Sequence, residues 1–379
     1  MSPPASNSAD TTTDSFALII DALLTFVWQQ WSHLGVSGDV PISRDQWLID
    51  PEALLLFTLR MGRFDPRLFD EVLDWCATSG EWLSVQRLKA LSKPLPAVET
   101  EDKVGVYQGE RPSPDVLAQT LNAVAATLLA HTRSGRWRAL LSPKGLDTDH
   151  REANEPIAFF RERTGEPLPM FGKEDPNFLA MGLSRSPVTL RGLSMPPPID
   201  APPCLILKLR ALFGLDPRAE VVTYLLTHPI AGTRELARAT GYAPSTIHTV
   251  LSRLSAGRFL QGGPNSGYEA ERHRWHAFLG ELPLRDATWV DWARILHALA
   301  NALNALDPVT ACQESPYLRA SRLLRLGEYL REALTGSGLP NPFATSWQIN
   351  DAAQRLPDAF LSLAHLLNGE KSAGLHVNR

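Results

Sequence analysis

Cysteine is scarce in this chain of 379 residues. Only Cys76, Cys204 and Cys312 are present, far apart in the sequence, and no CxxC pair occurs. A disulfide framework and a zinc ribbon both need regularly spaced cysteines, so neither is expected here. We predict three buried or idle thiols in the reducing environment of the cytoplasm.

Sequence motifs of common enzyme classes are missing as well. There is no GxxxxGK[ST], GxGxxG, HExxH or GxSxG segment, and these patterns carry phosphate cradles, zinc ligands or nucleophiles. The charged clusters at 150–155 and 161–166 are typical of solvated surface rather than of paired catalytic carboxylates. We therefore predict no enzymatic activity, no catalytic residue, no metal and no cofactor. An enzyme with its site in residues 133–203 remains an alternative, because that region has no readable pattern.

Long apolar runs are also absent. An apolar segment at 16–31 is interrupted by Asp21, Gln29 and Gln30 and is shorter than the roughly 20 apolar residues that cross a bilayer. Residues 1–10 lack the basic region of a secretory signal, and we expect residues 1–14 to be disordered. The sequence thus predicts a cytoplasmic protein with no membrane partner and a buried helix after residue 15.

Neither sign of charge is in large excess. The chain has 37 Lys and Arg against 41 Asp and Glu, which gives a net charge of −4. A protein that coats polyanions in general would be basic throughout. Any nucleic-acid site must therefore be a local basic patch.

Helical periodicity is present over most of the chain. Asp50-Pro51 and Asp65-Pro66 each place an N-capping acid before a proline at the first helical position, and Ser84 can cap a short helix that ends at residue 91. The prolines of residues 94–115 predict a linker, and residues 142–203 show few helical runs. Further helices are predicted at 115–131, 289–306, 317–334 and 357–367. The broad apolar faces of the helices at 289–306 and 317–334 suit an internal bundle or a second copy of the chain.

The segment Gly232–Leu254 is the most informative in the chain. It predicts two helices separated by Gly241, with Thr233 capping the first of them, after a helix that begins at Asp216-Pro217. The second helix of this pair has apolar residues at 247, 250, 251 and 254 on its inner face. Its outer face carries Ser245, Thr246, His248, Thr249, Ser252 and Arg253. These short donors and acceptors, with one His and one Arg, can approach base edges and phosphates in the major groove of DNA.

A β-hairpin is predicted directly after these helices. Residues 257–261 and 268–275 are expected to form strands on either side of a glycine-rich turn at 262–267. His273 and His276 could share a metal on a helix, but on a strand they point to opposite faces, so no metal site is expected.

The region between residues 217 and 276 is locally positive although the whole chain is acidic. Its arginines are Arg218, Arg234, Arg238, Arg253, Arg258, Arg272 and Arg274, seven in number. Its four acids are Glu220, Glu235, Glu269 and Glu271. A surface that faces phosphates needs this sign of charge.

Residues 216–275 resemble a winged helix-turn-helix of the ArsR/MarR type of bacterial transcriptional regulator. The resemblance rests on residues 218–222, 233–242 and 245–254 followed by Gly257, and the whole stretch is about a sixth of the chain. It implies that Ser245, Thr246, His248, Thr249 and Arg253 lie in the major groove, and that Arg258 or Arg272 in the wing contacts backbone phosphate. We add Arg234, Ser252 and Arg274 to these candidate DNA contacts. The metal-sensing cysteine pair of the family is missing, so metal sensing is not implied.

The predicted fold class is mainly α, a multi-domain helical protein containing a winged helix-turn-helix with one β-hairpin wing. Five segments are expected: a disordered N-terminus at 1–14, an N-terminal helical domain at 15–93, a linker and irregular or helical middle region at 94–203, the winged helix-turn-helix at 204–276 and a C-terminal helical domain at 277–379.

The N-terminal domain contains a possible second, degenerate copy of the motif. Residues 50–59 and residues 216–225 both begin with Asp-Pro and have apolar residues at similar positions after it. Residues 83–91 would then form a second recognition helix that presents Gln86, Arg87 and Lys89. A purely structural helical domain is the alternative.

The leading functional hypothesis is a sequence-specific DNA-binding transcriptional regulator whose partners are double-stranded DNA and, in a homodimer, a second copy of the chain. We expect binding to a defined operator that weakens with salt and with Arg253→Ala or His248→Ala. The alternative is a helical adaptor or antitoxin-like protein whose winged helix contacts a protein partner. Co-purification of a stoichiometric protein without DNA would favour that alternative.

Overall fold

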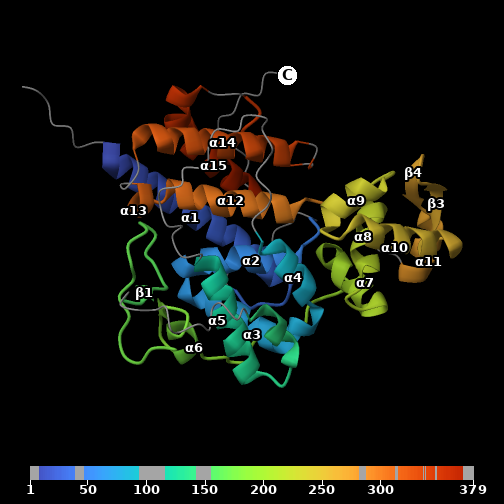
Figure 1. Cartoon of the computed structure of the whole chain (residues 1–379), viewed down its shortest axis with the longest axis horizontal. Coiled ribbons are helices and arrows are strands. Elements are labelled where there is room, and N and C mark those ends of the chain that lie inside the picture. Colours follow the sequence, from blue (N-terminus) through green and yellow to red (C-terminus); the bar gives the residue numbers. More distant parts are fainter. Residues whose placement is uncertain are drawn as a thin grey trace, which may run out of the picture.

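The computed structural model describes residues 8–38, 47–93, 116–141, 155–280, 287–311, 315–335, 337, 339–345 and 348–369. These residues form a mainly helical fold, as predicted. Figure 1 shows two lobes, a large one that we call the body and a small one that contains α7–α11, β3 and β4. The predicted linker at 94–115 lies outside the described residues.

The body combines helices from both ends of the chain. From the N-terminal half come α1 (Ser8–His33), α2 (Pro51–Met61), α3 (Pro66–Ser79), α4 (Val85–Leu91), α5 (Val116–His131) and α6 (Pro176–Leu179). From the C-terminal part come α12 (Trp292–Leu306), α13 (Pro308–Ala311), α14 (Pro316–Leu334) and α15 (Ile349–Leu367). Two short strands, β1 (Ile157–Ala158) and β2 (Leu183–Ser184), pair in parallel and were not predicted. Short 3-10 turns complete it: η1 (Gly62–Phe64), η2 (Gly80–Trp82), η3 (Gly135–Leu140) and η6 (Pro202–Cys204).

Capping side chains begin three of these helices as the sequence predicts. Asp50 Oδ1 accepts the N–H of Ala53 at 3.0 Å, and Asp65 Oδ1 accepts the N–H of Leu68 at 3.0 Å. Ser84 caps α4 through its hydroxyl. Each cap satisfies a backbone donor that the first helical turn leaves without a partner.

Three helix starts differ from the prediction by more than one residue. Helix α12 begins at Trp292 rather than at residue 289. Helix α1 begins at Ser8, so residues 8–14 are helical rather than disordered, and residues 1–7 lie outside the described part. Helix α15 begins at Ile349 and contains Pro357 in its interior, whereas proline was expected to open that helix. Pro357 is the ninth residue of the helix. It therefore lies past the first turn, where backbone N–H groups have no acceptor within the helix and a proline costs no hydrogen bond.

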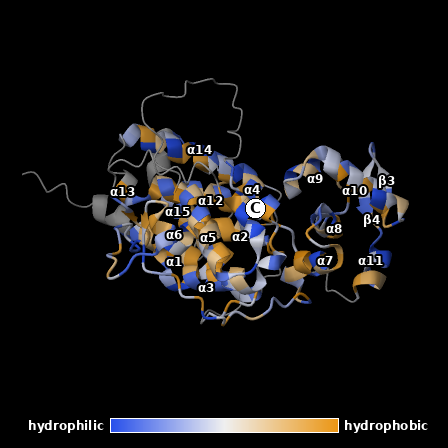
Figure 2. Cartoon of the chain, turned by 60° about the horizontal axis from the view of Figure 1, so that its bottom comes forward, coloured by the Kyte–Doolittle hydropathy of each residue, from blue (hydrophilic) through white to orange (hydrophobic). Residues whose placement is uncertain are grey.

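One hydrophobic core unites the body. It contains residues of α1, α2, α3, α5, α12, α14 and α15 together with some of the apolar residues between 159 and 207. In Figure 2 the apolar residues, drawn in orange, gather where α1, α2, α5 and α12 lie together. Trp31 and Trp75 are fully buried in it with ring centroids 5.1 Å apart. The predicted N-terminal, middle and C-terminal segments therefore share one packed interior.

Polar anchors hold the irregular segment 155–203 on the body. The guanidinium of Arg185 lies 4.9 Å from the ring centroid of Phe160 and 5.1 Å from that of Phe178, and it pairs with Asp70 at 2.8 Å. The carboxylate of Asp74 accepts three successive backbone N–H groups at 192–194. Such contacts need no periodic apolar pattern, so no helix or strand could be predicted over most of this segment.

The small lobe has a second core. It is built from α7 (Leu205–Phe213), α8 (Pro217–Thr227), α9 (Thr233–Thr240), α10 (Pro244–Ala256), β3 (Leu260–Gly263), β4 (Gly267–Ala270) and α11 (Arg272–Leu279). Leu48 and Ala287, from the segments that enter α2 and leave α11, also belong to this core. The second core thus extends past residue 276, where the predicted domain ended.

Candidate nucleic-acid interface

Helices α8, α9 and α10 form the framework of the candidate site. Gly241 ends α9 in the left-handed conformation, with φ 78°, and its N–H donates to the carbonyl of Ala237 at 3.0 Å. A residue with a side chain would be strained at this φ, so glycine lets the chain turn directly into α10. Ile247 and Leu251 of α10 are fully buried, which fixes the inner face of that helix as predicted.

The beginning of α9 differs from the prediction. Gly232 is the N-cap and Thr233 the first helical residue, so Thr233 does not cap the helix. Glu235 satisfies the helix start instead, because its carboxylate accepts the N–H of Gly232 at 3.3 Å and the hydroxyl of Tyr224 at 2.7 Å. These contacts hold an acidic side chain against α8 rather than in solvent.

The outer face of α10 is open to solvent. Five of its six predicted contact residues are exposed: Ser245, His248, Thr249, Ser252 and Arg253. The sixth, Thr246, is half-buried. The hydroxyl of Thr249 donates to the carbonyl of Ser245 at 3.0 Å. It can therefore only accept a hydrogen bond from a ligand. The other side chains keep their donors for a ligand.

The hairpin after α10 pairs β3 with β4 in antiparallel register, with Gln261 opposite Glu269. Ala231 bridges Tyr268 on the other edge of β4, so the segment between α8 and α9 is tied to the hairpin. Residues 260–270 contain no Lys or Arg. Any phosphate contact from the hairpin tip must therefore come from backbone N–H groups or from neutral side chains.

The second predicted strand is too long. β4 ends at Ala270, and Arg272 to Leu279 form helix α11, so Arg272 and Arg274 lie on a helix and not on the hairpin. Trp275 and Leu279 face the core one turn apart, with Trp275 Nε1 donating to the carbonyl of Phe259 at 3.1 Å. Both arginines are exposed.

His273 and His276 also lie on α11, so the strand argument against a shared metal was wrong. Neither becomes part of a larger ligand set. Within the part of the chain that the structure describes, no group of three or more His, Cys, Asp or Glu residues is arranged to hold a metal ion. His273 contacts Glu271 at 3.1 Å instead.

Arg258 has an unusual backbone. It lies between α10 and β3 with φ 60°, the one positive φ of a non-glycine residue in the described ranges. Its side chain is exposed. A left-handed conformation costs roughly 1–2 kcal/mol for an L-residue with a Cβ, so the arginine occupies a position where glycine would be more stable.

The exposed side chains of residues 217–276 carry a larger excess of positive charge than the sequence of this region alone indicates. Arg234, Arg238, Arg253, Arg258, Arg272 and Arg274 are exposed, whereas Arg218 is half-buried and pairs with Asp216 at 2.8 Å. Among the acids, Glu220 is buried, and Glu235 and Glu271 are half-buried with partners. Glu269 remains as the exposed glutamate of the four. Six exposed cations therefore stand against one exposed anion in residues 217–276.

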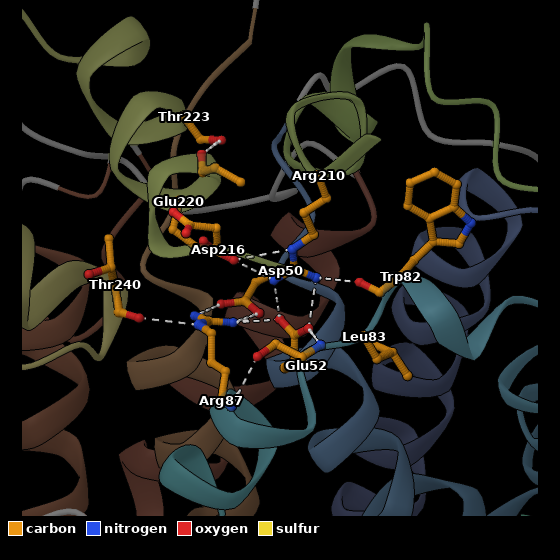
Figure 3. A network of polar contacts seen from close by, with 12 residues as sticks. Asp50, Glu52, Trp82, Leu83, Arg87, Arg210, Asp216, Glu220, Thr223 and Thr240 are labelled. Atoms are coloured by element: carbon orange, nitrogen blue, oxygen red, sulfur yellow. Dashed lines mark hydrogen bonds and ion pairs between the residues drawn. The ribbon is translucent and has the colours of Figure 1, made fainter. Parts of the chain in front are cut away.

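A buried network of charges joins this lobe to the body (Figure 3). Arg87 of α4 donates to both carboxylate oxygens of Asp50 at 2.5 Å and to Glu52 at 2.8 Å. Arg210 of α7 donates to both oxygens of Glu52 at 2.7 and 2.8 Å and to Glu220 of α8 at 2.6 Å. Glu52 thus bridges the two arginines. We call these five side chains the junction network.

The junction network also contacts the backbone of α9. Arg87 Nε donates to the carbonyl of Thr240 at 3.2 Å, at the carboxyl end of α9. Arg210 donates to the carbonyl of Trp82 at 2.6 Å, on the body side. The predicted second recognition helix is therefore wrong in its central residue, because Arg87 is 3% exposed and holds α9 instead of facing solvent.

Electrostatics inside the junction network favour the charged forms of Asp50, Arg87 and Arg210. Burial raises the pKa of Asp50, but the charge of Arg87 and its hydrogen bond more than offset this effect, so the pKa is lowered overall. Burial lowers the pKa of Arg210, and the charges of Glu52 and Glu220 raise it above its usual value. Buried ion pairs contribute little net stability compared with apolar packing, yet they fix one geometry. The network therefore defines how the small lobe sits on the body.

The small lobe also has large apolar side chains that are exposed. Phe278 of α11 is 52% exposed, and its ring lies 6.2 Å from those of Phe259 and Trp275. Leu212 and Leu215, on either side of the α7 terminus, are also exposed. Large apolar side chains exposed on a surface favour a protein contact where they form a patch.

Cys76 and Cys204 are buried, and burial raises the pKa of each thiol, to about 12 for Cys204. Cys312 lies outside the described residues. None of the described helices combines the length and apolar character needed to cross a membrane.

Comparisons of the chain with protein-family models, with curated proteins and with solved structures found no match.

Proposed function

We propose that the chain is a sequence-specific DNA-binding protein that inserts α10 into the major groove. The observation that carries the proposal is the outer face of α10, where short polar side chains, His248 and Arg253 are exposed together. A helix of this kind can bring donors and acceptors to base edges without steric conflict. The order α8, α9, α10 followed by a hairpin is the order of a winged helix-turn-helix.

The charge distribution supports the same proposal. Six exposed arginines around α9, α10 and α11 provide a local positive surface in a chain of net charge −4. Because phosphate neutralisation supplies most non-specific affinity, this surface would hold the duplex while α10 reads the sequence. In this proposal Arg234, Arg258, Arg272 and Arg274 contact phosphates, and regulation of transcription is the biological role.

The experiment that tests the proposal is retrieval of genomic DNA by the purified full-length chain. One defined sequence should be enriched, and a footprint on it should cover the bases that α10 reads. A paired footprint separated by about one helical turn, ~10 base pairs, would support a homodimer on two half-sites. Enrichment equal to that of an Arg253→Ala/His248→Ala double variant would argue against reading by α10.

A second candidate is an adaptor whose small lobe binds a protein. The exposed apolar side chains of Phe278, Leu212 and Leu215 favour it, because they lie on α11, on α7 and in the segment between α7 and α8, and not on α10. Purification of a stoichiometric protein complex that Phe278→Ser disrupts, with no DNA retrieved, would support this candidate. If α10 variants lose DNA binding and Phe278→Ser does not, protein binding is excluded as the main function of the small lobe.

A further inference from the structure

The body helix α4 lies beside the turn that joins α9 to α10, and both views of the chain place it next to α9 (Figure 1 and Figure 2). Arg87 Nε donates to the carbonyl of Thr240, the last residue of α9, at 3.2 Å. One turn further along α4, Leu91 Cδ2 lies 3.8 Å from the point that a β-carbon at Gly241 would occupy. Arg87 and Leu91 are four residues apart and therefore share one face of α4. This face holds the body against the turn from which α10 begins.

The surface around this contact is open to solvent on both sides. On the small lobe, Gly241 and residues 243–245 are exposed, and they lead into the outer face of α10. On the body, Gln86, Lys89 and Lys93 are exposed. Lys89 and Lys93 lie two positions before and two positions after Leu91, so both lysines are close in the chain to the residue that contacts the turn. The exposed side of α4 thus adjoins the amino end of α10.

The exposed charge of α4 is positive, like that of the small lobe. Residues 82–93 contain three cations and no Asp or Glu. The charge of Arg87 is matched by Asp50 and Glu52 inside the junction network, which leaves Lys89 and Lys93 as the cations on the surface of this segment. Glu81 is exposed but precedes α4, at the end of the helix away from Lys93. Two adjoining positive surfaces fit one extended polyanion.

We propose that the DNA interface continues from α10 onto α4 of the body, where Lys89 and Lys93 contact backbone phosphates beside the bases that α10 reads. A helix in the major groove lies between two phosphate strands, so cations that flank its amino end meet the backbone and not the base edges. A lysine binds phosphate as a point charge. The two lysines therefore add affinity without sequence preference, and Arg87 is a positioning residue that keeps α4 against α9. This inference rests on the proposed function.

Salt titration of DNA affinity tests the contact, with the full chain and a mixed-sequence duplex of about 30 base pairs as the probe. Each lost phosphate contact lowers the slope of log affinity against log salt by about 1, so Lys89→Ala/Lys93→Ala should lower the slope by about 2. The matched control is Lys173→Ala/Arg325→Ala, which removes the same charge from two exposed positions of the body away from α4. The control should keep the wild-type slope. Equal slopes for the two double variants would overturn the proposal.

Chemical modification of the wild-type chain gives a second readout that needs no variant. The exposed lysines are acetylated with an N-hydroxysuccinimide ester, with and without the same duplex, and the modified sites are located by mass spectrometry. The duplex should protect Lys89 and Lys93 and leave Lys173 as reactive as before. Modification of Lys89 and Lys93 that the duplex does not change would contradict the proposal.

The two readouts also separate this inference from the proposed function. If His248→Ala/Arg253→Ala loses preference for the retrieved sequence while the lysine variant keeps the wild-type slope, α10 reads DNA and the contact by α4 is wrong. If the duplex protects both lysines and the slope falls, but no sequence is preferred over another, the α4 contact stands and the sequence-specific function is wrong.

Discussion

Replacing Arg210 by methionine removes one cation from the junction network while keeping a side chain of similar length. Arg210 is 3% exposed, and its partners Glu52 and Glu220 are 0% and 1% exposed. The two carboxylates would lose their shared cation without access to water. Removing one partner of a buried pair costs about 3–5 kcal/mol because an uncompensated charge remains inside.

An exposed ion pair of the same chain provides the control. Arg163 pairs with Asp21 at 2.6 Å, but the two side chains are 39% and 61% exposed. Pairs of this kind contribute about 0–1 kcal/mol, so Arg163→Met should leave the free energy of unfolding nearly unchanged. The difference between the two variants isolates the effect of burial.

Urea denaturation followed by tryptophan fluorescence measures both variants. Arg210→Met should lower the unfolding midpoint strongly and Arg163→Met hardly at all. Hydrogen exchange should locate the loss at α7, α8 and α4. A cost for Arg210→Met below about 1 kcal/mol, equal to that of the surface pair, would refute the view that the network fixes the small lobe on the body.

Two further predictions concern single residues. Arg258→Gly should stabilise the fold or leave its stability unchanged, whereas Arg258→Ala should not, because the positive φ of Arg258 favours glycine by about 1 kcal/mol. Both variants should bind DNA more weakly than the wild type. Affinities equal to that of the wild type in salt titrations would contradict a phosphate contact by Arg258. The pKa of His297 is lowered from 6.5 by burial and by Arg60, so the unfolded chain binds more protons below about pH 6.5, and the free energy of unfolding should fall as pH decreases through that range. The same pH series on His297→Gln should show a flatter slope; identical slopes would rule out this contribution.

Local signals in the sequence predicted most of the helices. Asp50, Asp65 and Ser84 cap their helices as expected because a cap depends only on residues within one turn. The strand over residues 271–275 was wrong, although Trp275 and Leu279 already had the four-residue spacing of a helix face. Competing periodicities over so few residues are decided by packing, here by the contact of Trp275 with Phe259.

The junction network could not be predicted from the sequence. Arg210 meets Glu52 from 158 positions away and Arg87 meets Thr240 from 153. A single sequence shows an arginine on a helix but not whether a carboxylate from elsewhere will bury it. The interpretation of Arg87 as a DNA contact failed for this reason. The exposed residues of α10 could be predicted because the spacing of its apolar residues defines the buried face of the helix and therefore also the opposite, exposed face.

The most direct measurement of the central claim is the affinity of His248→Ala and Arg253→Ala for the retrieved DNA as a function of salt. Each variant should lose about 1–3 kcal/mol of binding free energy on the specific sequence. Arg325→Ala, an exposed arginine of α14 in the body, is the matched control and should bind as wild type does. Wild-type affinity should fall steeply with salt. Equal affinities of the α10 variants and the control would contradict the assignment of α10 as the DNA-reading helix.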